Sequence, residues 1–383
     1  MPENRVSLVR TPPEPSRQDI AVAVRRAVDL SGGLPAQIKA GASVLLKPNL
    51  VEVPRTRKSG AVTHPQLCRA VAEMVLERGA FVIIADSAGV GADTEAVIEY
   101  MGYGCLREAG FTVLDLKKSK VRRINVPGAI VMKHLRIFEP ALEADAIINL
   151  PVLKTHDQVE LTLGLKNLKG LLDDSSKMQM HRRGVVTGVV ETAAFFRPCL
   201  TVVDGIYCQE GVGPVYGDPV EMDLVIAGRD MVAVDTVAGL IAGYDPLEVP
   251  ITREAAARNL GTARLEEIKI CGLSIDEVKR PFKRCAQSSI LKNELPCRLY
   301  LPESACTGCR NTVIAVLVEF KEQKMLPLLS GKTIIAGRPP AAAPSGKLIL
   351  VGSCTKPMRL KGAYIGGCPP ENSHVVRALL KED

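Results

Sequence analysis

The chain has 383 residues with 46% hydrophobic, 24% charged and 4% aromatic residues, no tryptophan, and a net charge of +7. This length allows two or three domains with a large core, and the composition is ordinary for a globular protein. No apolar run reaches the roughly eighteen residues of a membrane span, and the first residues lack the apolar stretch of a secretory signal. We therefore expect a cytoplasmic protein with no membrane span.

The positive charge is concentrated in the last quarter of the chain, where residues 286–383 hold 13 Lys and Arg against 7 Asp and Glu. Such a surplus suits nucleic acid, an acidic partner protein or an anionic centre inside the segment. Because aromatic residues are scarce and we find no nucleic-acid-binding motif, we expect no nucleic-acid partner. An acidic electron-transfer protein is the candidate macromolecular partner.

The first predicted elements place polar side chains at the end of a strand. Apolar spacing predicts a helix over residues 19–31 and a strand over residues 43–46, which runs directly into Lys47 and Asn49. His64 precedes a proline at the first position of the next predicted helix.

A second buried strand is predicted over residues 81–85, and it ends at Asp86 before a glycine-containing loop over residues 87–92. A strand, a glycine loop and a helix start can bind an anion on backbone N–H groups. We favour a plain tight turn, because the two glycines lack the spacing of a dinucleotide or phosphate-binding loop.

The densest group of polar residues follows a predicted strand over residues 145–150. Since proline cannot donate to a central ladder, Pro151 should end this strand and leave Lys154 and His156 just past it, where open α/β sheets hold ligand groups. A helical pattern over residues 164–172 then carries Lys166, Asn167 and Lys169, with the two lysines on one face. The alternative interpretation is a solvated basic loop.

Further polar candidates follow in the same half of the chain. Residues 173–184 predict a loop, either simply exposed or with His181 and Arg182 closing over an anionic ligand. The next predicted strand ends at Asp204, and a glycine-rich connection begins at Glu210.

Alternating strands and helices predict an α/β fold with a mostly parallel sheet flanked by helices. We expect residues 1–285 to form this domain and residues 286–383 to form a small α/β module rich in cysteine.

Four of the eleven cysteines lie in residues 286–383 with a spacing that is compatible with a metal site. Cys306 and Cys309 form a Cys-x-x-Cys pair at a predicted helix start, Cys354 follows a predicted strand, and Cys368 follows two glycines. Four converging thiolates can hold a [4Fe–4S] cluster, and zinc is the alternative metal. Unligated thiols or a redox disulfide are the remaining interpretation.

Five motifs in order resemble the DUF362 family over roughly residues 40–275: residues 47–50, 149–156, 165–170, 203–214 and 233–235. This resemblance implies a domain that accompanies iron–sulfur clusters, often fused to a ferredoxin-like module, and it implies no single reaction. The cysteine run of a bacterial ferredoxin is absent here. Residues 366–370 are similar to the cluster loop in the small subunit of respiratory NADH-quinone oxidoreductases.

The leading hypothesis is a [4Fe–4S] redox protein that binds a small anionic molecule in the α/β domain and passes electrons through the cluster. As an enzyme, it would be an iron–sulfur oxidoreductase. The catalytic candidates are Lys47, His64, Asp86, Lys154 and His156. The substrate-binding candidates are Asn49, Lys166, Asn167, Lys169, His181, Arg182, Asp204 and Glu210. The alternatives are an electron-relay or partner-binding protein without its own substrate, and a non-redox lyase or isomerase with a structural metal site.

Overall fold

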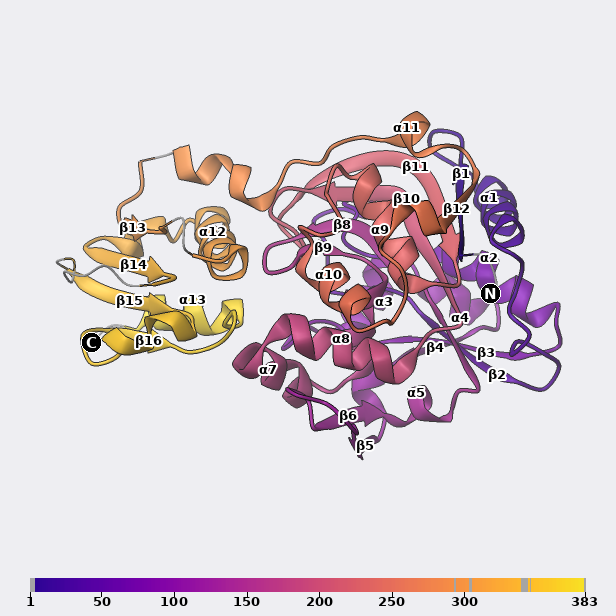
Figure 1. Cartoon of the computed structure of the whole chain (residues 1–383), viewed down its shortest axis with the longest axis horizontal. Coiled ribbons are helices and arrows are strands. Elements are labelled where there is room, and N and C mark those ends of the chain that lie inside the picture. The colour runs from indigo at the N-terminus through magenta and orange to yellow at the C-terminus, as the bar shows by residue number, and fades with distance from the viewer. Residues whose placement is uncertain (1–3, 293, 303–304, 339–343, 345, 382–383) are drawn as a thin grey trace.

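A computed structural model describes residues 4–292, 294–302, 305–338, 344 and 346–381. Its main feature is a ten-stranded sheet with helices on both faces (Figure 1). Eight strands follow one another across it: β12 (Ile268–Gly272), β1 (Asn4–Arg10), β11 (Asp218–Gly228), β10 (Leu200–Glu210), β7 (Ala146–Asn149), β2 (Ser43–Lys47), β3 (Phe81–Asp86) and β4 (Thr112–Asp115). The other two are β8 (Val152–His156) and β9 (Glu160–Thr162), which extend it beside β10.

The sheet is mostly parallel, as the alternation of elements predicts. The pairs β10–β7, β7–β2, β2–β3, β3–β4 and β1–β12 are parallel, whereas β11 runs antiparallel to both of its neighbours. β11 is antiparallel because a short connection joins it directly to β10, and only antiparallel neighbours can be joined without a crossover.

Both faces of the sheet are covered, so its central strands are apolar throughout. In β2, Val44 and Leu46 face one core cluster and Leu45 faces another, which is the two-residue period of a strand. The first face packs against α1 (Arg17–Leu30), α2 (Pro65–Leu76), α3 (Thr94–Met101) and α4 (Gly104–Glu108). The second face packs against α6 (Gly164–Asn167), α8 (Val185–Phe196), α9 (Met231–Ile241) and α10 (Pro250–Ala257).

The strand before Pro151 ends at Asn149, as predicted, but Lys154 and His156 lie on a further strand and not in a loop. The chain continues as β8, which pairs with the distal half of β10 and with β9. Proline lacks only the donor: the Pro151 carbonyl still accepts a hydrogen bond from the Asp204 N–H at 2.8 Å. Both side chains therefore project from a strand that extends the sheet.

The prediction of a loop over residues 173–184 is wrong, because most of these residues form the helix α7 (Asp174–Arg183). The Asp173 side chain caps this helix by accepting from the Ser176 N–H at 2.8 Å, and three basic residues fill the last turn. Nearby lie the hairpin of β5 (Val121–Asn125) and β6 (His134–Phe138) and the short helix α5 (Glu139–Glu143). α11 (Ile275–Val278) follows β12.

A separate four-stranded parallel sheet forms near the C-terminus, at the left of Figure 1. Its strands are β13 (Arg298–Tyr300), β14 (Lys332–Ala336), β15 (Lys347–Val351) and β16 (Ala363–Ile365), with helices α12 (Thr307–Glu322) and α13 (Asn372–Leu380). We call this part the C-terminal module. Cys306, Cys354 and Cys368 follow β13, β15 and β16, at the carboxyl edge of this sheet.

Candidate functional site

A cavity of ≈ 430 Å³ opens where the carboxyl end of the large sheet meets the C-terminal module. Strands β2, β3 and β8 and helices α6 and α7 line one side, and α12 and the start of α13 line the other. The basic residues on its walls are Lys47, Lys154, Lys166, Lys169, Lys177, His156 and His181. A cavity of this size with converging polar groups suits a small ligand, and this concentration of amines suits an anionic one.

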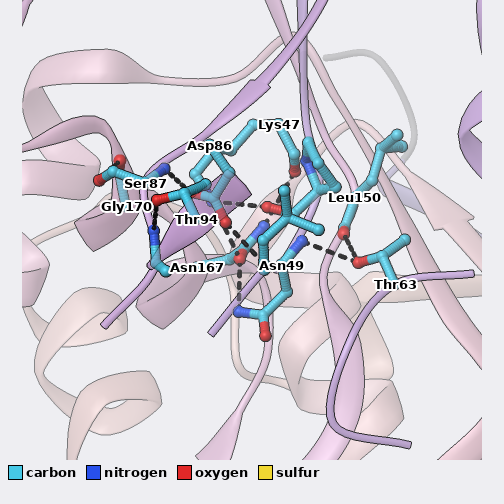
Figure 2. A network of polar contacts seen from close by, with 12 residues as sticks. Lys47, Asn49, Thr63, Asp86, Ser87, Thr94, Leu150, Asn167 and Gly170 are labelled. Carbon is cyan, nitrogen blue, oxygen red and sulfur yellow. Dashed lines mark hydrogen bonds and ion pairs between the residues drawn. The ribbon is translucent and has the colours of Figure 1, made fainter. Parts of the chain in front are cut away.

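Lys47 and Asp86 form a buried ion pair at the ends of the neighbouring strands β2 and β3 (Figure 2). Lys47 Nζ lies 2.7 Å from Asp86 Oδ1, and the two side chains are 1% and 3% exposed. The carboxylate also accepts from the N–H groups of Leu50 and Ser87, each at 2.7 Å. Burial lowers the pKa of Lys47, and the charge of Asp86 opposes that shift. The ion pair and the two backbone hydrogen bonds together fix the position of the Asp86 carboxylate.

Gly170 is in direct contact with this pair (Figure 2). A Cβ at position 170 would lie 2.1 Å from Asp86 Oδ1 and 2.8 Å from Lys47 Nζ. The Gly170 carbonyl accepts from Ser87 Oγ at 2.6 Å. The last residue of the motif at residues 165–170 is a glycine because no side chain fits there.

Two asparagines connect the ion pair to Lys154. Asn167 Oδ1 accepts from Lys47 Nζ at 3.3 Å and from Asn49 Nδ2 at 2.8 Å, and Asn49 Oδ1 accepts from Lys154 Nζ at 2.9 Å. Lys154 also donates to the carbonyls of Ala61 and Pro214. Its side chain is fully buried and forms no ion pair with a described residue, so burial and the neighbouring lysine charges lower its pKa well below the usual range.

Lys166, His156 and Asp157 form a chain of contacts along the wall. Lys166 Nζ lies 2.8 Å from His156 Nε2, and His156 Nδ1 lies 2.7 Å from Asp157 Oδ1. We assign the proton to Nδ1, because the alternative, with Nδ1 accepting from the Gln158 N–H at 3.0 Å, would set a bare nitrogen beside a carboxylate. Burial lowers the pKa of His156 to about 4 and that of Lys166 to about 8.

Lys169 and His181 form a second lysine–histidine pair. Lys169 Nζ lies 2.7 Å from His181 Nε2, and His181 projects from α7. Burial is the main cause that lowers the pKa of each, and the neighbouring lysine charges add to it. His181 is therefore neutral near pH 7, and its Nε2 accepts a hydrogen bond from Lys169 Nζ.

The loop over residues 87–92 lines the cavity, but most of its backbone N–H groups already have acceptors. The N–H groups of Ala88, Gly89 and Gly91 donate to Thr94 Oγ1, to the Val51 carbonyl and to Asp174 Oδ2. The loop therefore matches the tight-turn interpretation. Lys177 from α7 closes it, with hydrogen bonds to Ser87 Oγ at 2.8 Å and to the Ala88 carbonyl at 2.7 Å.

Four predicted site residues do not line the cavity. His64 caps α2 by accepting from the Gln66 N–H, and Asp204 accepts from the N–H groups of His64 and Ile206 while burial raises its pKa to about 6. Glu210 forms ion pairs with two basic residues near α11, and Arg182 is exposed. The other nine predicted residues of the α/β domain lie together on the cavity wall: Lys47, Asn49, Asp86, Lys154, His156, Lys166, Asn167, Lys169 and His181.

The four predicted metal ligands lie at one edge of the C-terminal module. Cys306 is the N-cap of α12 and Cys309 is buried in its first turn. A hydrogen bond with Cys306 and burial raise the pKa of Cys309, and the charges of Cys306, Cys368 and Cys354 raise it further, so the four thiols are within electrostatic reach. In the described residues no group of three or more His, Cys, Asp or Glu is arranged to hold a metal ion. The donor type and the helix N-terminus still fit a tetrathiolate centre.

The segment Cys368–Asn372 joins this cysteine edge to the cavity, and we call it the cysteine loop. The Cys368 N–H donates to the His181 carbonyl at 2.8 Å. Asn372 Nδ2 donates to Asp157 Oδ2 at 2.7 Å, and Gln158 Nε2 donates to the Pro370 carbonyl at 3.0 Å. The cysteine loop therefore contacts one lysine–histidine pair directly, through His181, and the other pair through Asp157.

Sequence reasoning missed several wall residues, namely Asp157, Gln158, Lys177, Glu319 and Asn372. Asp157 and Gln158 follow His156 directly, and the helix cap at Asp173 would have placed Lys177 one turn before His181. Nothing in the sequence signals that Asn372 contacts Asp157, because more than two hundred residues separate them.

No helix in the described ranges has both the length and the apolar character to cross a membrane. One relative is a thylakoid-associated protein of Synechocystis sp., 34% identical over 249 residues, which make up 63% of this chain and 75% of that protein.

Two solved structures are also similar. A protein from Thermotoga maritima matches with 12% identity and a TM-score of 0.36 over 55% of each chain, so this chain spans about half the length of that protein. The lactate racemase apoprotein from Thermoanaerobacterium thermosaccharolyticum matches with 12% identity and a TM-score of 0.39, over 88% of this chain and 69% of that one. Both scores are too low to inform the function of this chain.

The family model for DUF362, a domain of unknown function, matches residues 44–239. This range contains all nine predicted site residues of the α/β domain that line the cavity, from Lys47 to His181. The match spans half of the chain, and the chain belongs to the DUF362 family.

Proposed function

We propose that this protein is a cytoplasmic iron–sulfur redox protein that binds a small anionic molecule in the cavity. Electrons pass between this molecule and a [4Fe–4S] cluster at Cys306, Cys309, Cys354 and Cys368.

The observation that carries the proposal is the position of the cysteine loop. Cys368 is bonded through its backbone N–H to His181, whose ring contacts Lys169 on the cavity wall. Asn372, four residues later, is bonded to the Asp157–His156–Lys166 chain. Electron transfer between a cluster and a ligand requires the two to lie close together. Here one short segment carries a predicted cluster ligand, Cys368, and contacts the residues of the cavity wall.

The residues of the cavity have separable tasks within this proposal. Lys166 and Lys169 bind the anion, since each has N–H donors left after its contact with a histidine. His156 and His181 are neutral and each accepts a hydrogen bond from a lysine, so each ring orients the lysine nitrogen toward the ligand. The cluster, when bound, supplies one-electron transfer.

The chain should be purified under anaerobic conditions and its iron and acid-labile sulfide measured, with electron paramagnetic resonance of the reduced protein. We expect about four irons and four sulfides per chain. Cys354→Ser should lower both, whereas Cys105→Ser, at an exposed thiol far from the module, should not. Zinc in place of iron, or protein without metal, would remove the redox part of the proposal.

The anion part is tested separately with inorganic phosphate and acetate as probes. Isothermal titration calorimetry should detect binding that weakens in Lys166→Gln and Lys169→Gln. Arg182→Gln is the matched control, because Arg182 is a nearby exposed cation that does not line the cavity. Equal binding by all the variants would contradict the anion site.

A further inference from the structure

The lysines of the cavity fall into two groups according to their acidic partners. Lys47 is paired with Asp86 at 2.7 Å, and Lys177 lies 3.2 Å from Asp174 Oδ1. Lys154, Lys166 and Lys169 form no ion pair with a carboxylate among the described residues. Lys154 donates to three oxygen atoms, whereas Lys166 and Lys169 each contact only an imidazole. Lys166 and Lys169 lie three residues apart along α6 and the 3-10 turn that follows it, and their remaining N–H groups can donate to an anionic group. We call these two lysines the anion-binding pole of the cavity.

Another part of the same cavity has the opposite character. Glu52, which is exposed, and the half-buried Glu319 and Tyr216 line it, and neither glutamate side chain forms a hydrogen bond or ion pair within the described part of the chain. Partial desolvation raises the pKa of both glutamates, and the charge of Glu52 raises that of Glu319 further. The charges of both glutamates also act on Tyr216, so the three side chains are close together.

The remaining acidic side chains of the cavity are already engaged. Asp86 is paired with Lys47, Asp157 contacts His156 and Asn372, and Glu371 caps α13 by accepting from the Ser373 N–H at 2.8 Å. Among the described residues, Glu52 and Glu319 are thus the acidic side chains of the cavity that have no hydrogen-bond or ion-pair partner. Two carboxylates beside an aromatic ring are the groups that recognise an organic ammonium.

We propose that the ligand is zwitterionic, with a carboxylate or phosphate bound by Lys166 and Lys169 and an amine bound by Glu52, Glu319 and Tyr216. The inference rests on the anion site of the proposed function and adds the second pole. The apolar side chains of Val51 and Val215, which also line the cavity, accommodate the ligand's carbon chain between the poles.

The test compares ligands that differ only in the amine, using the full chain and isothermal titration calorimetry. The pairs are γ-aminobutyrate with butyrate, ε-aminocaproate with caproate, and phosphoethanolamine with ethyl phosphate. The first two pairs probe a carboxylate at two lengths, and the third probes a phosphate. We expect at least one amine-bearing ligand to bind about tenfold more tightly than its partner, equivalent to about 1.4 kcal/mol.

The double variant Glu52→Gln/Glu319→Gln should abolish this preference and leave binding of the amine-free partners unchanged or slightly tighter. Glu322→Gln is the matched control, since Glu322 lies one turn further along α12 and pairs with Arg55 outside the cavity. Equal affinity within every pair, or a preference that persists in the double variant, overturns the zwitterion and leaves the anion site intact. Failure of all six ligands to bind overturns both.

Discussion

Replacing Lys47 with methionine tests whether the Lys47–Asp86 pair is a structural element of the cavity floor. The substitution keeps the length of the side chain but leaves the Asp86 carboxylate buried at 3% exposure, with only two backbone N–H donors. Removing one partner of a buried ion pair typically costs about 3–5 kcal/mol. Asp86→Asn should cost a similar amount, because it leaves the Lys47 ammonium buried without a counter-charge.

The double variant Lys47→Met/Asp86→Asn removes both charges, so its loss should be smaller than the sum of the two single losses by about 2 kcal/mol or more. The free energies come from chemical denaturation followed by circular dichroism. Arg17→Met serves as the control, since Arg17 and Glu73 form an exposed pair whose loss should cost at most about 0.5 kcal/mol. Additive losses at Lys47 and Asp86, or a cost below about 1 kcal/mol for Lys47→Met, would refute the reasoning.

Three other substitutions follow from the same geometry. Gly170→Ala should destabilise the chain by about 2 kcal/mol or more by denaturation, because its Cβ would meet Asp86 Oδ1 at 2.1 Å, whereas Gly239→Ala, with its nearest contact at 3.6 Å, should not; equal effects would contradict the close approach. Because the pKa of Lys166 is lowered to about 8, phosphate affinity measured by calorimetry should fall as pH rises through 8, and Lys166→Met should flatten that part of the profile; an unchanged profile would exclude Lys166 as its source. Asn372→Ala removes a hydrogen bond to a charged group, worth about 1.5–3 kcal/mol, and should weaken phosphate binding about tenfold, while His374→Ala on the same helix should leave it unchanged; equal affinities would show that the cysteine loop does not support the cavity.

The sequence predicts the α/β architecture well because its signals are local. Buried strands such as residues 81–85 appear as continuous apolar runs, and His64 before a proline marks the start of α2, as the structure confirms. Nine of the predicted α/β residues lie on one cavity wall, since parallel strands bring their carboxyl ends to a common edge.

The errors have physical causes that local patterns do not capture. The strand before Pro151 does end, but the local pattern gives no sign that the chain pairs with β10 again as β8, because that pairing depends on the length of β10. Asp204 looked like a ligand at a strand end, yet its carboxylate serves two backbone N–H groups. The contact between Asn372 and Asp157 depends on how two distant parts of the chain pack, so no spacing in the sequence could predict it.

The cavity draws its walls from two sources, and this has an engineering consequence. Lys166 and Lys169 lie inside the matched family range of residues 44–239, whereas Glu319 and Asn372 belong to the C-terminal module. A chimera that keeps the first part and exchanges the second should still bind anions, but it should prefer ligands with a different second charged group. Exchange of the C-terminal module should therefore change which ligands are preferred and leave the two anion-binding lysines in place.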